Sequence, residues 1–383
     1  MEKLNIGLFI DTWFPMVDGV INVVDNYAKR LCKFANVTVF APNVGEFDRS
    51  KFPYKIVSCK STKFLGLDYR LPLPKLDKNF KKEIKAANID IIHIHSPFSI
   101  GKMAASFGNK NKIPVVATFH SQFKQDFMRA TKSKLITKLL LKIITKVFNR
   151  ANLLLTMNPK CSEIIKSYGY KGRIELLPNG TDLAPNQNLT DLIAKIKKIN
   201  NLTDEKILIN IGRLTKLKNI DLVIDSCKIL KQENFHFKLF IVGGGQDEKY
   251  FKKKVNANNL SKEIVFVGKI LDQSLKSAYL ASADLNVFPS FYDTDGIVKI
   301  EAAAFETPTL FAKGSVASSS CIDGVNGYIA DAEPNSFAKK IIEIFNDTNY
   351  SAVCKRAKND LYLSWDGVVE KLLNIYFKEK KND

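Results

Sequence analysis

The segment KILINIGR, Lys206–Arg213, decides how this chain is organised. It is a short run of isoleucine and leucine that ends in a glycine and a cation, which is typical of a buried parallel strand followed by a functional loop. Similar runs recur downstream, separated by stretches of helical length: Lys238–Val242, Ile264–Val267, Asp284–Phe288 and Thr309–Phe311. An earlier series lies upstream: Leu4–Ile10, Val37–Ala41, Ile91–His95, Pro114–Thr118 and Asn152–Thr156. The alternation predicts an α/β fold with two parallel sheets, one on each side of the restart at Lys206.

The length of the chain agrees with two domains. At 383 residues it is too long for one ordinary core and fits two domains of about 150 to 200 residues each. Between the two series lie Leu183–Leu189 and a polar helix, which we interpret as a linker. Doubly wound domains bind ligands at the carboxyl ends of their strands, so we expect the site in the cleft between the domains.

Composition limits the class of partner. The formal net charge of +19 favours an anionic partner, such as nucleic acid, acidic lipid headgroups or a phosphorylated substrate. The sequence has no C2H2 spacing and no RNP-like or arginine-rich motif, so we expect no nucleic-acid partner. The six cysteines form no CxxC pair, the N-terminus lacks the apolar core of a signal peptide, and no run of about 18 apolar residues occurs. We therefore expect a cytoplasmic protein with reduced thiols and no membrane-spanning segment.

The segment PSFYDTDGIVKIEA, Pro289–Ala302, places three acids around one glycine and has two incompatible interpretations. In the first, Asp293 and Asp295 form a DxD pair that chelates a metal ion. In the second, Asp293 and Glu301 form the working pair and accept hydrogen bonds from the vicinal hydroxyls of a ribose and a hexose. A chelated cation would duplicate the charge of nearby basic residues, and no third hard ligand is evident, which favours the second interpretation.

The glycine of this segment marks the start of a helix. Asp295 precedes it at the position expected of an N-cap, whose carboxylate accepts from the next backbone amides. The amides near Gly296, Ile297 and Val298, together with the positive end of the helix dipole, then form a pocket suited to a phosphate.

Cationic side chains follow the strand that ends at Gly212. Arg213, Lys216 and Lys218 combine a guanidinium fork with ammonium groups, which suits a diphosphate, although a solvated basic loop explains them equally well. The glycines of Gly243–Gly245 also follow a strand, but they lack the GxGxxG spacing, so we expect no nicotinamide cofactor.

Candidate residues of the first half also follow strands. Gly19 opens a helix after the first strand, and His95 and His120 each end a strand of buried character. The end of such a strand faces the cleft, although a lone histidine more often has a structural role.

Taken in order, these elements resemble the family 4 retaining glycosyltransferases of GT-B fold, over nearly the whole chain. The matching elements are the glycine-containing loop after the first strand, HSPFSIG (His95–Gly101), TFH (Thr118–His120), PNGTD (Pro178–Asp182), GRLTKLKN, VGGG, FVG (Phe266–Gly268), two acids separated by seven residues, and DGVNGY (Asp323–Tyr328). The segment SWDGVVEKLL, Ser364–Leu373, resembles the last helix of that fold, which crosses back onto the N-terminal domain. The resemblance implies two Rossmann-like, doubly wound domains that face a central cleft. The acceptor-side domain is residues 1–185 plus 364–383, and the nucleotide-sugar-binding domain is residues 203–363.

The resemblance also implies a role for each candidate residue. In that family Arg213 and Lys218 bind the donor diphosphate, and Glu301 binds the nucleotide ribose. Asp293 contacts the hydroxyls of the donor sugar, with His120 beside the sugar. The donor site further includes Gly19 close to the phosphates, Gly268, and the helix start formed by Gly296, Ile297 and Val298. The implied reaction needs no metal and no cofactor, its co-substrate is a nucleotide diphosphate sugar that we expect to be UDP-linked, and its retention of configuration is explained by front-face attack.

Several positions depart from the pattern of this family. Asp293 replaces the usual Glu, Asp18 replaces a Gly found in many members, and Glu306 replaces a common Gly. If the backbone at Glu306 is left-handed, it adds strain of roughly 1 kcal/mol. The loop Ser315–Ser320 lacks the Gly-Gly and Glu that many members carry. A nucleotide-sugar-binding protein without catalytic activity, a sugar-nucleotide epimerase and a basic nucleic-acid binder are therefore the competing hypotheses.

The segment Lys134–Arg150 has a basic ridge along an apolar face. The basic residues are Lys134, Lys138, Lys142, Lys146 and Arg150, and the apolar ones are Leu135, Leu139, Ile143 and Val147. A core-packed helix with a solvated edge explains this pattern. So does an interfacial helix on an anionic membrane surface, with Phe123 and Phe127 adding apolar insertion.

The acceptor is predicted from two neighbouring elements. HSPFSIG followed by TFHSQF resembles most closely the diacylglycerol glycosyltransferase branch, which implies a glycerolipid or lipid-linked glycan as acceptor. We therefore predict a hexosyltransferase that is peripheral on the inner face of the cell membrane. The alternative is a glycosyltransferase that builds a surface polysaccharide on a glycan acceptor.

Overall fold

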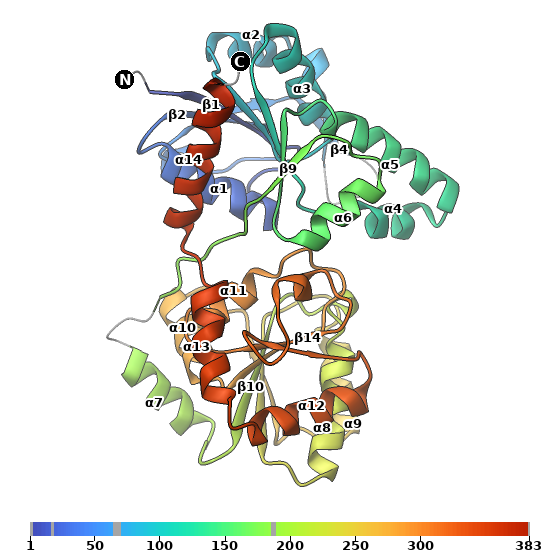
Figure 1. Ribbon diagram of the computed structural model, residues 1–383, viewed down its shortest axis with the longest axis vertical. Coiled ribbons are helices and arrows are strands. Elements are labelled where there is room, and N and C mark those ends of the chain that lie inside the picture. Colours follow the sequence, from blue (N-terminus) through green and yellow to red (C-terminus); the bar gives the residue numbers. More distant parts are fainter. Residues whose placement is uncertain (1–2, 17–18, 64–69, 185–188, 382–383) are drawn as a thin grey trace. The chain divides into compact units, whose positions relative to one another are not determined.

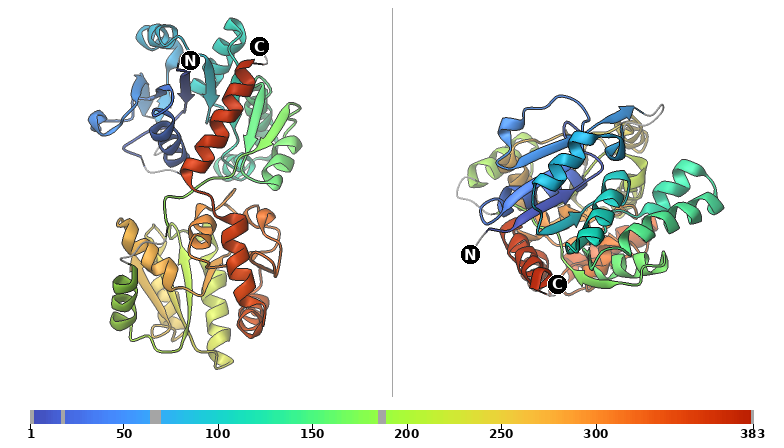
Figure 2. Two further views of the ribbon diagram at one scale, coloured as in Figure 1. Left: turned by 60° about the vertical axis from the view of Figure 1, so that its left-hand side comes forward. Right: turned by 90° about the horizontal axis from the view of Figure 1, so that it is seen from above.

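The computed structural model describes residues 3–16, 19–63, 70–184 and 189–381, which form two compact units. Unit 1 comprises Met1–Asn179 and Trp365–Asp383, and unit 2 comprises Gly180–Ser364. Each unit is a parallel sheet with helices on both of its faces (Figure 1 and Figure 2). This is the doubly wound α/β architecture that the alternating pattern predicts, present twice.

The sheet of unit 1 has seven parallel strands in the order β3-β2-β1-β6-β7-β8-β9. Their bounds are β1 Asn5–Phe9, β2 Asn36–Pro42, β3 Lys55–Cys59, β6 Ile91–Ile94, β7 Val115–Thr118, β8 Leu153–Thr156 and β9 Arg173–Leu176. A small antiparallel pair, β4 (Ser61–Lys63) and β5 (Arg70–Pro72), lies outside it. The central strands β6, β7 and β8 are buried along their whole length, which explains why their sequences are continuous apolar runs.

The helices of unit 1 follow their strands in the chain, with one exception. They are α1 Gly19–Leu31, α2 Lys78–Ala86, α3 Ser99–Asn111, α4 Phe123–Thr131, α5 Lys134–Phe148 and α6 Pro159–Ser167, with short 3-10 turns at Arg49–Lys51 and Pro74–Leu76. The exception is α14, Trp365–Lys381, which comes from the end of the chain and packs beside α1 (Figure 2). Its Trp365 ring meets the edge of Tyr27 at 5.9 Å between centroids.

The sheet of unit 2 has six parallel strands in the order β12-β11-β10-β13-β14-β15. Their bounds are β10 Lys206–Ile211, β11 Phe237–Val242, β12 Ile264–Gly268, β13 Leu285–Phe288, β14 Thr309–Ala312 and β15 Tyr328–Ala330. The helices are α7 Leu189–Ile199, α8 Ile220–Gln232, α9 Glu248–Ala257, α10 Gln273–Ser282, α11 Ile297–Ala303, α12 Pro334–Asn346 and α13 Tyr350–Leu361, with 3-10 turns at Lys216–Lys218 and Ala317–Ser320.

Alternate residues of the central strands of unit 2 enter separate cores on the two faces of the sheet. Leu208 and Leu239 pack in the cluster that includes α8, α9 and α12. Ile207, Ile209 and Phe240 point the other way and pack with α7 and α10. This period of two is the direct result of strand geometry.

The polar helix that we interpreted as part of a linker belongs to unit 2. This helix, α7, packs on α10 and buries its Leu189 and Ile196 in the second core. Its charged residues misled the sequence interpretation because a surface helix needs only one apolar stripe to pack. Part of the proposed linker, residues 185–188, lies outside the described residues.

Candidate functional site

The candidate residues of unit 2 lie at or after the ends of three strands of one sheet. Arg213 and Lys218 follow β10, Gly268 ends β12, and Asp293 lies in the loop after β13. In a parallel sheet the carboxyl ends of adjacent strands lie at one edge, and β12, β11, β10 and β13 are adjacent. The loops after these strands therefore build one continuous surface at the carboxyl edge of this sheet.

Two glycines let the loops after β10 and β11 pack directly on each other. A Cβ atom on Gly243 would lie 1.9 Å from the carbonyl oxygen of Gly212, and one on Gly245 would lie 2.4 Å from that of Leu214. Neither backbone can move away cheaply, so a side chain at either position would separate the two loops. The VGGG element thus has the close-packing role expected of a tight turn.

Lys218 and Asp293 contact each other directly. The Lys218 Nζ lies 2.5 Å from Asp293 Oδ1, and both side chains are about one-fifth exposed. The ammonium also lies 6.0 Å from the centroid of the Tyr292 ring. The side chain of Arg213 is exposed and makes no ion pair within the described residues. This part of the loop surface combines two cationic groups with a carboxylate. The cations can bind an anion, and the carboxylate can accept a hydrogen bond from a hydroxyl.

Asp295 does not cap α11, which corrects the sequence prediction. The N-cap position is occupied by Gly296, whose φ of +71° is left-handed. Gly296 also packs closely on Phe288, because an added Cβ would lie 2.6 Å from the Cζ of the Phe288 ring. The Asp295 carboxylate turns instead to Lys299, with 2.6 Å between Oδ1 and Nζ, and the two side chains are 3% and 4% exposed. The sequence interpretation failed because a lysine in the first turn of a helix is usually solvated, whereas this lysine is buried.

The two acids of the DxD interpretation therefore each have a lysine partner. Asp293 is paired with Lys218, and Asp295 is paired with Lys299. Throughout the part of the chain that the structure describes, no group of three or more His, Cys, Asp and Glu side chains is arranged to hold a metal ion. The prediction that the reaction needs no metal rests on the resemblance and remains a prediction.

Glu301 has one oxygen held and one oxygen available. Its Oε1 accepts from Lys276 of α10 at 2.6 Å, while its Oε2 is buried and has no hydrogen-bond partner within the described residues. A buried carboxylate oxygen without a donor is costly, and a ligand hydroxyl would satisfy it. Sequence reasoning did not find Lys276, because nothing in the pattern of α10 distinguishes it from other surface lysines.

The helix that carries Glu301 is short. The predicted phosphate pocket consists of Gly296 at its cap and Ile297 and Val298 in its first turn, and α11 is only seven residues long. The phosphate role of these amides stays a prediction.

Gly19 begins α1 at the carboxyl end of β1 in unit 1. An added Cβ at Gly19 would meet nothing within 4 Å, so packing within the described residues does not require glycine there. Open space at a strand-to-helix turn suits the close approach of a ligand. Asp18, which departs from the family's pattern, lies outside the described residues.

Three histidines of unit 1 lie together at the carboxyl ends of β6 and β7: His93 and His95, which are buried, and His120, which is half-buried. They are called the buried histidine cluster below. His95 Nδ1 lies 3.0 Å from His120 Nε2, and the rings of His93 and His95 lie 4.0 Å apart. Burial lowers the pKa of all three below the ordinary value, to about 3 for His120. The imidazoles are therefore neutral at physiological pH.

His93 was missed by sequence reasoning, which considered only the strand-ending histidines. Its two ring nitrogens bond to hydroxyls, Nδ1 with Tyr376 of α14 at 2.6 Å and Nε2 with Thr118 of β7 at 2.7 Å. The partner from α14 is 283 positions away in the chain, so no local signal could reveal it.

Asp11 explains why the HSPFSIG element has its sequence. Its carboxylate accepts from the amides of Ile100 at 2.7 Å and Gly101 at 3.3 Å, which start α3. A Cβ on Gly101 would lie 1.9 Å from the carbonyl oxygen of Ser96, so only glycine fits. Burial raises the pKa of Asp11 to about 7, against the opposing effect of these backbone donors. This acid lies two residues after the first strand, and sequence reasoning assigned it no role.

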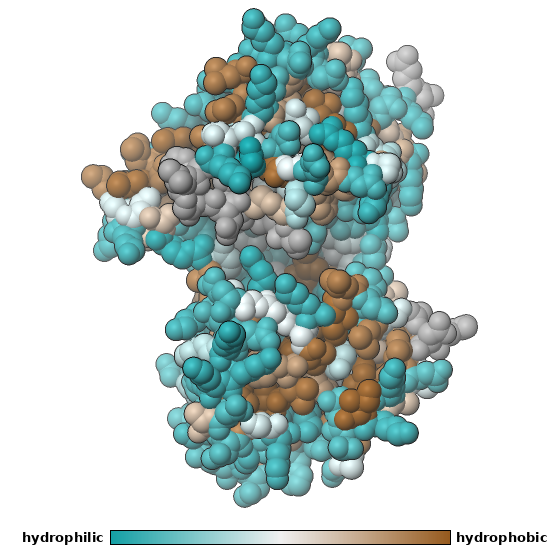
Figure 3. All heavy atoms as spheres, turned by 180° about the vertical axis from the view of Figure 1, so that it is seen from behind, coloured by the Kyte–Doolittle hydropathy of each residue, from teal (hydrophilic) through white to brown (hydrophobic). Residues whose placement is uncertain are grey.

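The amphipathic helix predicted over 134–150 is α5, and its apolar ridge is largely exposed. Leu135, Leu139 and Ile143 are 79%, 57% and 45% exposed, whereas Val147 is buried. Lys138, Lys142 and Lys146 are also exposed on this helix. Figure 1 shows α4 and α5 projecting from the sheet of unit 1, and Figure 3 shows apolar and hydrophilic side chains mixed on this projection.

The aromatic residues upstream of α5 do not take part in this exposed surface in the way we expected. Phe123 is only 7% exposed, and its ring packs against Phe119, Phe148 and Phe98. Phe127 is half-buried and stacks on Phe123. The prediction that Phe123 inserts into a membrane is therefore wrong, because it belongs to the aromatic core beneath α4. Across the described residues no helix is both long enough and apolar enough to cross a bilayer.

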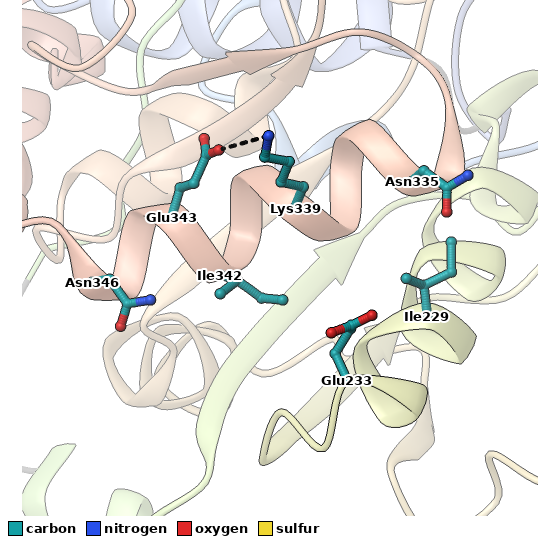
Figure 4. A pocket seen from close by; sticks show the side chains of 7 residues that line it. All are labelled: Ile229, Glu233, Asn335, Lys339, Ile342, Glu343 and Asn346. Atoms are coloured by element: carbon teal, nitrogen blue, oxygen red, sulfur yellow. Dashed lines mark ion pairs between the residues drawn. The ribbon is translucent and has the colours of Figure 1, made fainter.

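A groove of about 610 Å³ lies on the surface of unit 2 between α8 and α12 (Figure 4). The side chains that line it are Ile229, Glu233, Asn335, Lys339, Ile342, Glu343 and Asn346. None of them is a candidate site residue, and the groove presents charges of both signs around two isoleucines. Its chemistry does not select a ligand.

Comparison with known proteins identifies the family. Residues 17–185 match the model described as Glycosyltransferase Family 4, and residues 193–360 match the model described as Glycosyl transferases group 1. The chain belongs to the family 4 glycosyltransferases of GT-B fold. The two matched segments cover most of the chain and correspond to its two α/β units.

Two relatives carry the same name. An alpha-monoglucosyldiacylglycerol synthase of Acholeplasma laidlawii is 24% identical over 343 residues, covering 85% of this chain and 84% of that protein. An alpha-monoglucosyldiacylglycerol synthase of Streptococcus pneumoniae is 26% identical over 321 residues, covering 80% and 70%. These relatives match the diacylglycerol glycosyltransferase branch that the motifs resemble.

The fold is also that of solved glycosyltransferases. The crystal structure of Anabaena Alr3699/HepE in complex with UDP superposes with a TM-score of 0.78 over 97% of this chain and 99% of that one, at 16% identity. At this identity the likeness establishes the GT-B fold of this glycosyltransferase.

Proposed function

We propose that this protein transfers a hexose, with retention of configuration, from a UDP-linked sugar to a membrane-associated hydroxyl acceptor, a glycerolipid or a lipid-linked glycan. The two relatives named as monoglucosyldiacylglycerol synthases support a lipid acceptor. The observation that carries the proposal is the exposed apolar ridge of α5, flanked by lysines, on a protein of this family.

The donor is proposed to bind at the carboxyl edge of the sheet of unit 2. Glu301 accepts from a ribose hydroxyl through Oε2, the buried oxygen that has no donor within the described residues. Arg213 and Lys218 neutralise the diphosphate, and Asp293 accepts from hydroxyls of the sugar while it orients Lys218. Gly19 and Gly268 leave room for close approach to the phosphates and the base.

The proposed reaction exchanges one bond to the anomeric carbon for another. The bond from that carbon to the β-phosphate oxygen breaks, the acceptor oxygen bonds to the same face, and the departing phosphate oxygen takes the acceptor proton. Negative charge develops on the diphosphate, where Arg213, Lys218 and the start of α11 at Gly296, Ile297 and Val298 would stabilise it by preorganised electrostatics. His120 lies beside the sugar in this arrangement. No resident cofactor or metal takes part.

The acceptor is proposed to reach the enzyme at a membrane surface. Each exposed lysine of α5 near an anionic surface contributes about 1 kcal/mol, and the apolar ridge adds the burial of Leu135, Leu139 and Ile143. This predicts a peripheral protein on the inner face of the cell membrane. Nucleic acid is not a proposed partner.

A transfer assay tests the activity. The protein is incubated with UDP-glucose, UDP-galactose or GDP-mannose and with vesicles of anionic phospholipid containing diacylglycerol, and the lipid product is followed by mass spectrometry. Release of nucleotide diphosphate that requires diacylglycerol supports the proposal. Transfer to soluble oligosaccharides alone would favour the polysaccharide alternative, and nucleotide binding without turnover for any acceptor would favour an inactive binding protein. Activity that a chelator abolishes and manganese restores would overturn the metal-free mechanism.

Substitutions at the proposed diphosphate site and on α5 separate donor chemistry from membrane binding. Arg213→Ala and Lys218→Met should each lower turnover by about two orders of magnitude, because each uncovers about 3 kcal/mol of leaving-group stabilisation. Near-native rates in both variants would place the diphosphate elsewhere.

The triple variant with Lys138, Lys142 and Lys146 replaced by Gln should stop pelleting with anionic vesicles. It should keep turnover with a detergent-solubilised acceptor. Equal binding of the native protein to neutral and anionic vesicles would refute the membrane-surface assignment.

A further inference from the structure

The buried histidine cluster leaves one nitrogen atom without a partner. His95 Nε2 is buried and has no hydrogen-bond partner within the described residues, whereas His95 Nδ1 lies 3.0 Å from His120 Nε2. His93 shows the contrast, because both of its nitrogens bond to hydroxyl groups. A neutral imidazole carries one proton. Its position on Nδ1 or Nε2 decides whether the buried Nε2 of His95 is an acceptor or an N–H donor without a partner.

Two arrangements of protons are compatible with the distance between His95 and His120. In one, His95 carries its proton on Nδ1 and donates it to His120 Nε2. In the other, His120 Nε2 donates to His95 Nδ1, and the proton of His95 is then on Nε2, as a buried N–H group without an acceptor. Orphaned buried N–H groups are rarer in proteins than orphaned acceptors, so the first arrangement is favoured.

We propose that His95 is a positioning residue that holds His120 in the tautomer with a bare Nε2 and a protonated Nδ1. An imidazole with Nε2 engaged by His95 can present only a hydrogen-bond donor through its other nitrogen. Burial keeps both rings neutral, since it lowers the pKa of each.

The consequence for catalysis rests on the proposed function, in which His120 lies beside the donor sugar. A donor at that position can bond to a hydroxyl or phosphate oxygen, which is what a nucleotide sugar offers. The opposite tautomer would present a lone pair, which repels a phosphate oxygen and can only accept from a hydroxyl. His95 therefore determines whether His120 presents a hydrogen-bond donor or an acceptor to the substrate, without contacting the substrate itself.

The number of histidines makes this inference directly measurable. The chain has four histidines, so long-range nitrogen–proton NMR spectra of ligand-free, histidine-labelled protein can be assigned by single substitutions. We expect His120 to show a protonated Nδ1 and a bare Nε2. A protonated Nε2 on His120 in the native protein would overturn the proposal.

A matched pair of variants tests the role of His95. His95→Asn keeps an amide donor at the same distance from the backbone as Nδ1, whereas His95→Leu fills a similar volume without a donor. The leucine variant should shift the tautomer ratio of His120. It should also lower kcat at least tenfold, while KM for the sugar donor stays within about twofold. The asparagine variant should restore most of the native tautomer ratio and most of the native kcat. Unchanged NMR signals and kcat in a folded His95→Leu protein would refute the proposal.

A control addresses the rest of the cluster. Tyr376→Phe removes the hydroxyl that bonds to His93 Nδ1 at 2.6 Å, and it should alter the signals of His93 but not the tautomer of His120. If no donor supports transfer in any variant, the proposed function fails, while the NMR spectra still decide the tautomer.

Discussion

Replacing Asp295 by Asn separates a helix cap from a buried ion pair. If Asp295 capped α11, asparagine would be nearly neutral, because it caps helices as well as aspartate does. In the structure Asp295 is the partner of Lys299 at 2.6 Å, and both side chains are almost fully buried. Removing one member of a buried ion pair leaves the other charge uncompensated, which costs about 3 to 5 kcal/mol.

Other contacts of Lys299 reduce this cost only in part. Its Nζ also donates to Ser320 Oγ at 2.8 Å and more weakly to the carbonyl of Ala317 at 3.4 Å. Neutral acceptors can solvate an ammonium group but do not balance its charge. We therefore expect Asp295→Asn to destabilise unit 2 by at least about 3 kcal/mol, which corresponds to a fall in Tm of roughly 6 °C or more for a domain of this size.

The assay can follow each unit separately. Both tryptophans, Trp13 and Trp365, belong to unit 1, so their fluorescence during urea unfolding reports that unit. Hydrogen exchange of peptides from β13, α11 and β14 reports unit 2. The variant should lose protection in those peptides, while the fluorescence transition serves as an internal control.

A double variant tests whether the cost comes from an unpaired charge. Lys299→Met alone should be as harmful as Asp295→Asn, whereas Asp295→Leu combined with Lys299→Met should cost less than the sum of its single changes, because no charge is left unpaired. A loss below about 1 kcal/mol in Asp295→Asn would refute the ion-pair reasoning and restore the cap.

Three further predictions concern other sites. Glu301→Gln should weaken UDP binding by about 1.5 to 3 kcal/mol, measured by titration calorimetry, because it loses charge-assisted bonds; Glu306→Gln is the matched control, and equal effects of the two would contradict the ribose role. Glu306 has a φ of +60° and pairs with Lys358 at 2.9 Å, so Glu306→Gly should be about 1 kcal/mol more stable than Glu306→Gln in urea unfolding; a less stable glycine variant would show that no strain exists. Unit 1 should gain stability as pH rises from about 4 to 6.5. The folded-state pKa of each buried histidine is depressed, so that contribution is lost on acidification, while Asp11, whose pKa is raised to about 7, acts oppositely. Each group changes the free energy of unfolding by at most about 1.4 kcal/mol per pH unit, and the three histidines outweigh the single aspartate. Urea unfolding followed by tryptophan fluorescence at pH 5 and 6.5 measures the direction of the change, and stability that falls between these two pH values would refute the prediction.

The interior of both sheets was predictable from sequence, and several of their edges were not. All but one of the runs assigned as strands became interior strands, because burial on both faces demands continuous apolar residues, and the exception, Ile264–Val267, became the edge strand β12. The edge strands β3, β9 and β15 were missed, since an edge strand is partly exposed and its sequence, such as RIEL in β9, mixes charged and apolar residues. The order of strands followed from no sequence pattern.

The positions of several candidate residues relative to the strands were also predictable, whereas the partners of each group were not. Arg213, Lys218, Asp293 and His120 were predicted to follow strands and do so, and parallel strands bring their carboxyl ends to one edge of a sheet. The left-handed backbone at Glu306 followed from a family comparison and appears at φ +60°. The inferences from strand position depend only on local order along the chain, whereas the one at Glu306 depends on the pattern of the family.

Tertiary structure alone decided which groups pair. Lys276 reaches Glu301 across 25 positions, Lys218 reaches Asp293 across 75, and Tyr376 reaches His93 across 283. The burial that turns Lys299 from a surface lysine into the counterion of Asp295, and that keeps the histidine cluster neutral, is likewise a property of the packed unit. Periodicity reports which face of an element is apolar, but charge pairing and desolvation depend on what the neighbouring elements place against that face, and the sequence does not carry that information locally.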